Sequence, residues 1–205
     1  MNLITDGDST ASSTLLDRVR ASDARAWQRF AALYAPWVYR LARRAGLDEN
    51  DAADIGQEVF MTAALRIDSF RREEPGQSMR RWLSQIARHK IGDWLRVHNR
   101  TPAAVGGDTG PISQVADSNG FCTEEFDTEV EDEGPLIRRA IELIRTDFQD
   151  HTWLAFRSTV LESRPTADVA AELNMTPKAV RQARYRVLRR LREEFDGLID
   201  MSGMD

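Results

Sequence analysis

The sequence predicts an all-α protein made of two small helical domains joined by an acidic flexible linker. Apolar residues recur at intervals of three and four through both ends of the chain, as they do on the buried face of a helix. No segment has the two-residue alternation of a half-buried strand. Between the two ends, residues 101–134 hold nine acidic and no basic residues, together with several glycines and prolines. That composition is typical of a linker.

Composition narrows the class of protein. The chain has 205 residues, a net charge of -5 and one cysteine, Cys122, so an internal disulfide framework is excluded and a reducing cytoplasm is favoured. No apolar run approaches the ~20 residues that a membrane span needs. The first 14 residues are polar and acidic, which predicts a disordered tail and not a signal peptide. The histidines lack ligand spacing, so we expect no metal site and no cofactor.

The first domain is expected over residues 15–100, with every element helical. The pattern predicts helices over 15–21, 24–45 and 51–67, a polar loop over 68–77, and a long helix over 78–97. Gly46 is expected to end the second of these helices. Their apolar stripes include Trp27, Phe30, Ala31, Tyr34, Val38, Leu41, Ala45, Ile55, Val59, Met79, Leu83, Ile86, Ala87, Trp94 and Val97.

The linker, residues 101–134, has two possible roles. It is either a solubilising tether, or an anionic strand that occupies a basic channel until nucleic acid displaces it.

Residues 166–195 read as two helices joined by a tight turn. Thr166 is expected to cap the first helix, and Thr176 to cap the second with Pro177 at its first position. Asn174 suits the left-handed conformation between them. This arrangement predicts a helix-turn-helix.

The second of these helices is strongly basic. Between residues 176 and 192 it carries seven basic residues and no acidic one, whereas a merely solvated face usually includes acidic partners. We therefore favour DNA contact over an ordinary solvated face. Arg184 falls within the apolar arc and is expected to reach the surface or pair with an acid. The arc itself comprises Val180, Ala183, Val187, Leu188, Leu191 and Phe195.

The order of these segments resembles a known family. The run DAADIGQEVFMTAALRIDSF, a loop, SMRRWLSQIARHKIGDWLR, an acidic linker and a basic helix-turn-helix together resemble a bacterial extracytoplasmic-function (group 4) sigma factor. Residues 15–100 are similar to sigma domain two, and residues 135–195 to sigma domain four. Residues 196–205 are expected to form a tail.

The resemblance implies a polymerase-binding helix. The segment that grips the coiled coil of the β′ clamp in this family corresponds to an amphipathic helix with an acidic outer face. The alternative is an ordinary solvated helix face. The residues that the resemblance implies for the polymerase contact are Asp51, Asp54, Gln57, Glu58 and Phe60.

The resemblance also implies a surface for the promoter -10 element. An opened strand requires a cationic track and faces on which unstacked bases can stack. Phe70 and Trp82 either supply such faces or pack in the core. The residues implied are Phe70, Arg71, Arg72, Arg80, Arg81, Trp82, Arg88, His89 and Arg96.

The basic helix is implied to read the -35 element in the major groove. We expect Trp153, Leu154, Phe156 and Val160 to form its supporting core with Ile137, Ile141 and Ile144. Many family members have arginine where Ala183 stands and leucine where Arg184 stands. The residues implied to contact DNA are Thr176, Lys178, Arg181, Gln182, Tyr185, Arg186, Arg189 and Arg190.

The expected function is that of a sigma factor that binds core RNA polymerase and directs promoter recognition and opening. An anti-sigma protein is a further candidate partner. The alternative is a stand-alone helix-turn-helix regulator that binds duplex DNA as a dimer. A helical enzyme is disfavoured, because the chain contains no nucleophile motif, phosphate loop or metal-ligand set.

Overall fold

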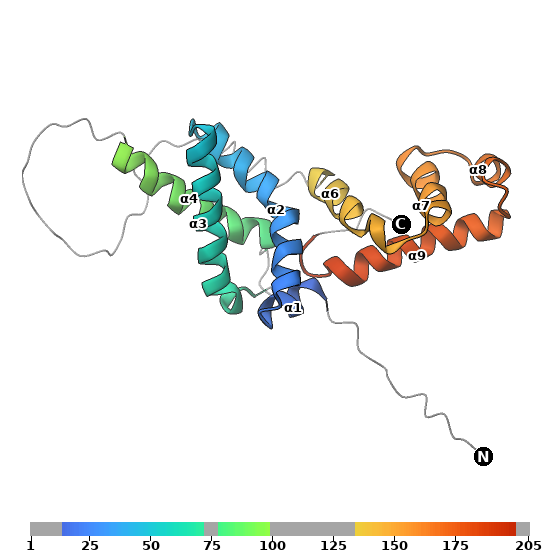
Figure 1. Ribbon diagram of the computed structural model, residues 1–205, viewed down its shortest axis with the longest axis horizontal. Coiled ribbons are helices and arrows are strands. Elements are labelled where there is room, and N and C mark those ends of the chain that lie inside the picture. The colour runs from blue at the N-terminus through green and yellow to red at the C-terminus, as the bar shows by residue number, and fades with distance from the viewer. Residues whose placement is uncertain (1–13, 72–77, 99–133, 200–205) are drawn as a thin grey trace, which may run out of the picture. The chain divides into compact units, whose positions relative to one another are not determined.

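The structure is a computed structural model that describes residues 14–71, 78–98 and 134–199. Within these ranges every regular element is a helix, which confirms the all-α prediction (Figure 1). The contacts divide the chain into two compact units. The first joins the residues up to Leu33 to those from Gly134 onward, and the second begins at Tyr34. The predicted linker up to Glu133 lies outside the described residues.

The helix α2 (Ala24–Arg44) belongs to both units, because the division falls between Leu33 and Tyr34. The sequence groups residues 15–100 as one domain. The contacts instead place residues 14–33 with the C-terminal segment. Side chains separated by more than one hundred residues make these contacts, and helical periodicity does not predict such pairings.

The first unit begins with α1 (Leu15–Arg20), which a reciprocal capping box starts. The Asp17 backbone N–H donates to Thr14 Oγ1 at 3.2 Å, and the Thr14 N–H donates to Asp17 Oδ2 at 3.1 Å. Leu15 and Val19 are fully buried. A turn with Ser22 at a φ of 59° then leads into α2.

Replacing Asp23 with alanine is expected to lower stability at pH 7, and the loss is expected to shrink in acid. Asp23 Oδ1 accepts the backbone N–H groups of Ala26 at 3.1 Å and Arg25 at 2.7 Å, and these bonds hold the pKa of Asp23 below its ordinary value of 3.8. The carboxylate therefore stabilises the fold above that ordinary value, and the contribution disappears as the pH falls through the lower folded-state value.

Urea denaturation at pH 7 and in acid would measure this difference between the wild type and Asp23→Ala. Asp23→Asn is the control, because asparagine also caps helices but does not titrate. A loss from Asp23→Ala that is equally large at both pH values would contradict the assignment.

The rest of the first unit consists of helices that end at the C-terminus. They are α6 (Gly134–Ile144), η2 (Arg145–Asp147), α7 (Asp150–Phe156), η3 (Arg157–Leu161, a π-helical turn), α8 (Thr166–Glu172) and α9 (Pro177–Phe195). Most of the predicted supporting core is buried, but Leu154 is 42% exposed. Its prediction as a core residue is wrong, because Leu154 lies on the face of α7 opposite the buried residues Thr152, Trp153, Ala155 and Phe156. Beyond α9, Leu198 and Ile199 are also buried, although the sequence suggested a tail there.

The second unit contains the rest of α2 with α3 (Glu49–Arg66), η1 (Ile67–Ser69) and α4 (Met79–His98). Gly46 follows α2 with a φ of 90°, so this predicted helix end is confirmed. Asp48 caps α3 by accepting the Asp51 N–H at 2.8 Å. The helices α3 and α4 pack together. At the end of α4, Val97 is 67% exposed and is not the core residue that its place in the apolar stripe predicted. Across the described ranges, no helix is long and apolar enough to cross a membrane.

Candidate nucleic-acid and polymerase interfaces

The helix-turn-helix forms from α8, a short turn and α9. Asn174 has a φ of 52°, as predicted, and the Met175 N–H donates to Ala170 O at 2.9 Å. Thr176 caps α9 by accepting the Ala179 N–H on Oγ1 at 3.1 Å. The predicted cap of the first helix is wrong. Thr166 is the first residue of α8, and the preceding residue, Pro165, offers its carbonyl to the first turn.

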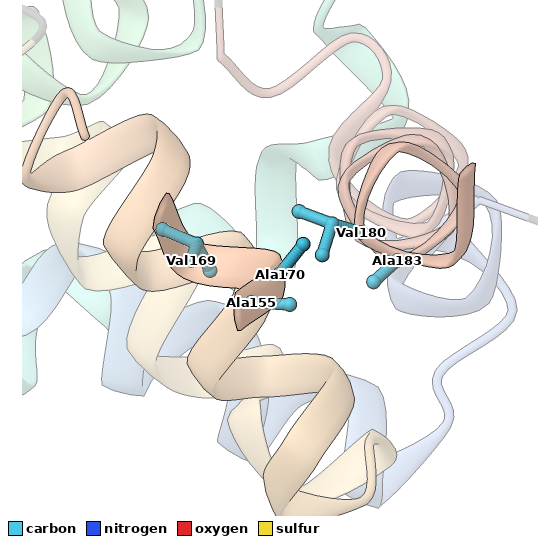
Figure 2. Packing of buried hydrophobic residues seen from close by; sticks show 5 residues of the cluster. All are labelled: Ala155, Val169, Ala170, Val180 and Ala183. Atoms are coloured by element: carbon cyan, nitrogen blue, oxygen red, sulfur yellow. The ribbon is translucent and has the colours of Figure 1, made fainter. Parts of the chain in front are cut away.

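A cluster of small apolar residues holds the helix-turn-helix together (Figure 2). Ala155 of α7, Val169 and Ala170 of α8, and Val180 and Ala183 of α9 are all buried. Three of the five are alanines, which allow the helix axes to approach closely. Ala183 is only 3% exposed, so an arginine at this position would have to leave the cluster. The cluster fixes α9 with its opposite face outward.

The outward face of α9 carries most of the residues predicted to contact DNA. The whole predicted apolar arc of α9 is buried. Arg184 is exposed, so it does not occupy the buried arc. Tyr185 is 62% exposed. The other exposed members of the predicted set are Thr176, Lys178, Arg181, Gln182, Arg186 and Arg189.

Two residues predicted to contact DNA, Arg189 and Arg190, are bonded to acidic side chains. Arg189 Nε donates to Glu193 at 2.6 Å, and this bond raises the pKa of Arg189. Arg190 binds Glu194 at 2.8 Å and Asp147 at 3.0 Å. Partial burial opposes the charged form of Arg190, but the two carboxylates outweigh it and raise its pKa.

Glu194 itself is the centre of a group of charges that the sequence did not reveal. Its side chain is 3% exposed and lies 2.8 Å from Arg18 Nη2 and 3.0 Å from Arg29 Nε. We refer to Glu194, Arg18, Arg29 and Arg190 as the Glu194 cluster. It joins α1, α2 and α9. A glutamate at an apolar position near the end of a basic helix is the only hint of it in the sequence.

In the second unit, the outward face of α4 is basic. Arg81, His89 and Arg96 are exposed, and Arg88 is half-buried. His89 Nδ1 is bonded to Gln85 O at 2.7 Å, and Arg96 pairs with Asp93 one turn earlier. These side chains lie on the side opposite the core, as a cationic track requires.

Two residues predicted for this surface are buried instead. Phe70 is fully buried and lies 5.7 Å from the half-buried Trp82, ring centre to ring centre. Arg80 is 2% exposed, with its guanidinium 5.3 Å above the Trp37 ring. Both fall on the inner side of the η1–α4 region, so neither offers a face or charge to DNA in this structure. Arg71 is exposed, and Arg72 lies outside the described residues.

The outer face of α3 combines acidic and apolar side chains. Asp54, Gln57 and Glu58 are exposed, while Asp51 and Phe60 are half-buried. Glu58 pairs with Lys90 of α4 at 3.0 Å.

The same face continues into two large exposed apolar residues that the sequence analysis did not select. Met61 is 64% exposed and Leu65 is 88% exposed. With Asp54 and Gln57 they follow intervals of three, four and four, so all four lie along one side of the helix. We call these four residues the α3 stripe. Exposed apolar groups aligned in this way are typical of a helix that packs against a partner.

One part of the chain matches a known family model. Residues 30–101, about a third of the chain, match the family model of sigma-70 region 2. This match covers the second part of α2, α3 and α4. This part of the chain is therefore similar to region 2 of the sigma-70 family.

Two relatives are similar over most of the chain. The extracytoplasmic-function (ECF) RNA polymerase sigma factor BldN of Streptomyces coelicolor is 24% identical over 188 residues, which are 91% of this chain and 66% of BldN. The chain thus spans just under two thirds of that relative. The RNA polymerase sigma factor CnrH of Cupriavidus metallidurans is 27% identical over 173 residues, which are 80% of this chain and 86% of CnrH. Both relatives are RNA polymerase sigma factors, and BldN bears the name of the extracytoplasmic-function family that the sequence resembles.

A solved structure is also similar. A chain from the RsbN–BldN complex is 20% identical, covers 86% of this chain and 96% of its own length, and has a TM-score of 0.35.

Proposed function

We propose that the protein binds core RNA polymerase and directs it to promoters through two DNA-reading surfaces. The observation that carries this proposal is the division of α9 into a buried apolar arc and an exposed face with Lys178, Arg181, Gln182 and Arg186. A helix held this way by a helix-turn-helix has the form that enters a major groove. Arginine and glutamine are among the side chains that read base edges there.

The second DNA-reading surface is the basic face of α4. Arg81, Arg88, His89 and Arg96 form a track for the backbone of an opened strand. Binding energy gained only on the exposed strand shifts the equilibrium from closed to open duplex. Because Phe70 and Arg80 are buried, we assign this role to the outward residues of α4 and to Arg71.

The polymerase contact is assigned to the α3 stripe with Glu58 beside it. The acidic end of the stripe suits a basic partner helix, and Met61 and Leu65 supply apolar area that is already exposed in the free protein. In this function the protein binds and positions, and polymerase performs the chemistry.

Run-off transcription with purified core polymerase and a randomised promoter library tests the proposal. We expect transcripts that require this protein and share an upstream and a downstream element. A gel shift with duplex DNA, run with and without core polymerase, separates this function from that of a stand-alone dimeric regulator. Tight specific binding without polymerase, together with no stimulated transcription, would refute the proposal.

Replacing Arg181 with alanine is expected to weaken binding of the polymerase complex to the upstream element by about 10-fold or more, the cost of one good base contact being about 1–3 kcal/mol. If Arg181 contacts a phosphate instead, binding should weaken equally on all sequences and the salt slope should fall by about one. Fluorescence anisotropy at several salt concentrations measures both quantities.

Arg157→Ala is the matched control for Arg181→Ala. Arg157 is also an exposed arginine of the first unit, but it pairs with Glu162 at 2.9 Å and lies outside α9. If the two variants bind the upstream element equally well, the assignment of Arg181 to DNA is wrong.

A further inference from the structure

A groove in the first unit exposes apolar side chains that the proposed function does not use. It has a volume of about 630 Å³ and lies between α6, α7 and η3. Leu154 and Leu161 line it and are 42% and 48% exposed, and the buried Trp153 also lines it. Large apolar side chains gathered in an exposed hollow are typical of a surface that a partner covers.

The charged residues of the groove leave it with a positive surplus. Two of them are already paired, Glu142 with Arg139 at 3.2 Å and Arg157 with Glu162 at 2.9 Å. Within the described residues, no ion pair engages the remaining groove charges, which are two arginines of α6 and one carboxylate. A partner that carries an unpaired carboxylate beside apolar groups would complement this surface. The three remaining charged residues are Arg138, Arg145 and Asp150.

The α3 stripe has the properties that the groove requires of a partner. Met61 and Leu65 are 64% and 88% exposed at one end of the stripe. Asp54 is exposed at the other end, and no residue of the described ranges forms an ion pair with it. The stripe covers about 16 Å of helix at 1.5 Å per residue. The side of α7 and η3 that lines the groove, residues 150–161, has a similar length.

We propose that the protein self-associates head to tail, with the α3 stripe of one copy seated in the groove of a second copy. The apolar end of the stripe then covers Leu154 and Leu161, and Asp54 meets the positive surplus of the groove. The contact is heterologous, because stripe and groove are different surfaces, so a dimer leaves one stripe and one groove open to further copies. The apolar area on each side is small, so the association is weak and reversible.

Self-association has a consequence for the proposed function. The α3 stripe is also the surface assigned to polymerase, so a copy whose stripe lies in a groove is unavailable to core polymerase. Polymerase and the second copy therefore compete for the stripe, and an excess of polymerase separates the copies by mass action. Only this consequence rests on the proposed function, because the self-association itself is measured without polymerase.

Sedimentation velocity of the full-length chain tests the self-association over roughly 1 to 100 μM, a range suited to a weak contact. A reducing agent prevents Cys122 from linking two copies. We expect the sedimentation coefficient of the wild type to rise with concentration. Leu65→Lys in the stripe, and Arg138→Glu combined with Arg145→Glu in the groove, should each raise the dissociation constant at least 10-fold. Val97→Lys, on α4 and outside both surfaces, is the matched control and should associate as the wild type does.

A mixture of the two disrupted variants distinguishes the head-to-tail contact from other kinds of association. Leu65→Lys keeps an intact groove, and the double arginine variant keeps an intact stripe. We therefore expect a one-to-one mixture to form a complex that stops at two copies, although each variant alone stays monomeric. Association of stripe with stripe, or of groove with groove, would give no such rescue.

Three results would overturn the proposal: a wild type that stays monomeric throughout the range, an association that neither variant weakens, or a mixture that stays monomeric where the wild type associates. Melting temperatures identify a variant that fails to fold. If the double arginine variant fails, Leu161→Glu, a change at an exposed groove residue, replaces it in the same mixture. The absence of transcripts with core polymerase would refute the proposed function and leave the self-association standing.

Discussion

Replacing Leu65 with lysine should reduce the affinity for core RNA polymerase by about 30-fold or more while the fold remains intact. Leu65 is 88% exposed at the end of the α3 stripe, so it contributes little to the protein's own core. Fully burying an exposed leucine side chain contributes about 1.5–3 kcal/mol, and a lysine there would also be desolvated. Fluorescence titration of labelled protein with core polymerase measures the change.

The matched control for Leu65→Lys is Val97→Lys. Val97 is 67% exposed and apolar, and it lies on α4 in the same unit but outside the stripe. It should bind core polymerase as the wild type does, and both variants should keep the wild-type melting temperature. Wild-type affinity in Leu65→Lys would place the polymerase interface elsewhere on the protein.

Glu194→Ala is expected to destabilise the first unit by about 2 kcal/mol. Removing one partner of a buried ion pair typically costs about 3–5 kcal/mol, because a buried charge is left uncompensated. We expect less than that here, since the arginines of the cluster are each about one-third exposed and recover part of their hydration. The melting temperature of this unit should fall by roughly 8–16 °C. Urea denaturation and calorimetry measure the two quantities.

The neighbouring residue provides the control for this prediction. Glu193 also pairs with an arginine, Arg189, at 2.6 Å, but both side chains of that pair are exposed to solvent, at 35% and 63%. Because exposed ion pairs contribute little, Glu193→Ala should change the melting temperature far less than Glu194→Ala. Equal effects from the two substitutions would mean that Glu194 is not a buried centre of charge in solution.

Local signals in the sequence were sufficient to predict where the helices lie and which face of α9 is exposed. Thr176 and Pro177 start that helix by short-range hydrogen bonding and fixed backbone geometry. Asn174 and Gly46 take positive φ angles where the sequence suggested turns. The spacing from Val180 to Phe195 assigned the buried arc of α9 correctly, because helical geometry repeats every 3.6 residues.

Local signals did not distinguish inward from outward side chains where several helices meet. Phe70 and Arg80 are residue types that suit a DNA-binding surface, but the packing of η1 and α4 in the second unit buries them. Leu65 is a residue type typical of a core, but no part of the described chain covers it. Burial depends on which helices pack against a residue, and its own side chain does not specify that.

The sequence by itself determined the class of fold, the helix-turn-helix and the basic face of α9, because each follows from interactions within a few residues. Only the tertiary structure decided that Glu194 is buried among Arg18, Arg29 and Arg190. The physical reason is that burying the Glu194 carboxylate is unfavourable unless cations pair with it. Two of these cations, Arg18 and Arg29, come from the other end of the chain. A glutamate becomes tolerable in a core only when distant cations are brought to it by the packing of apolar helices.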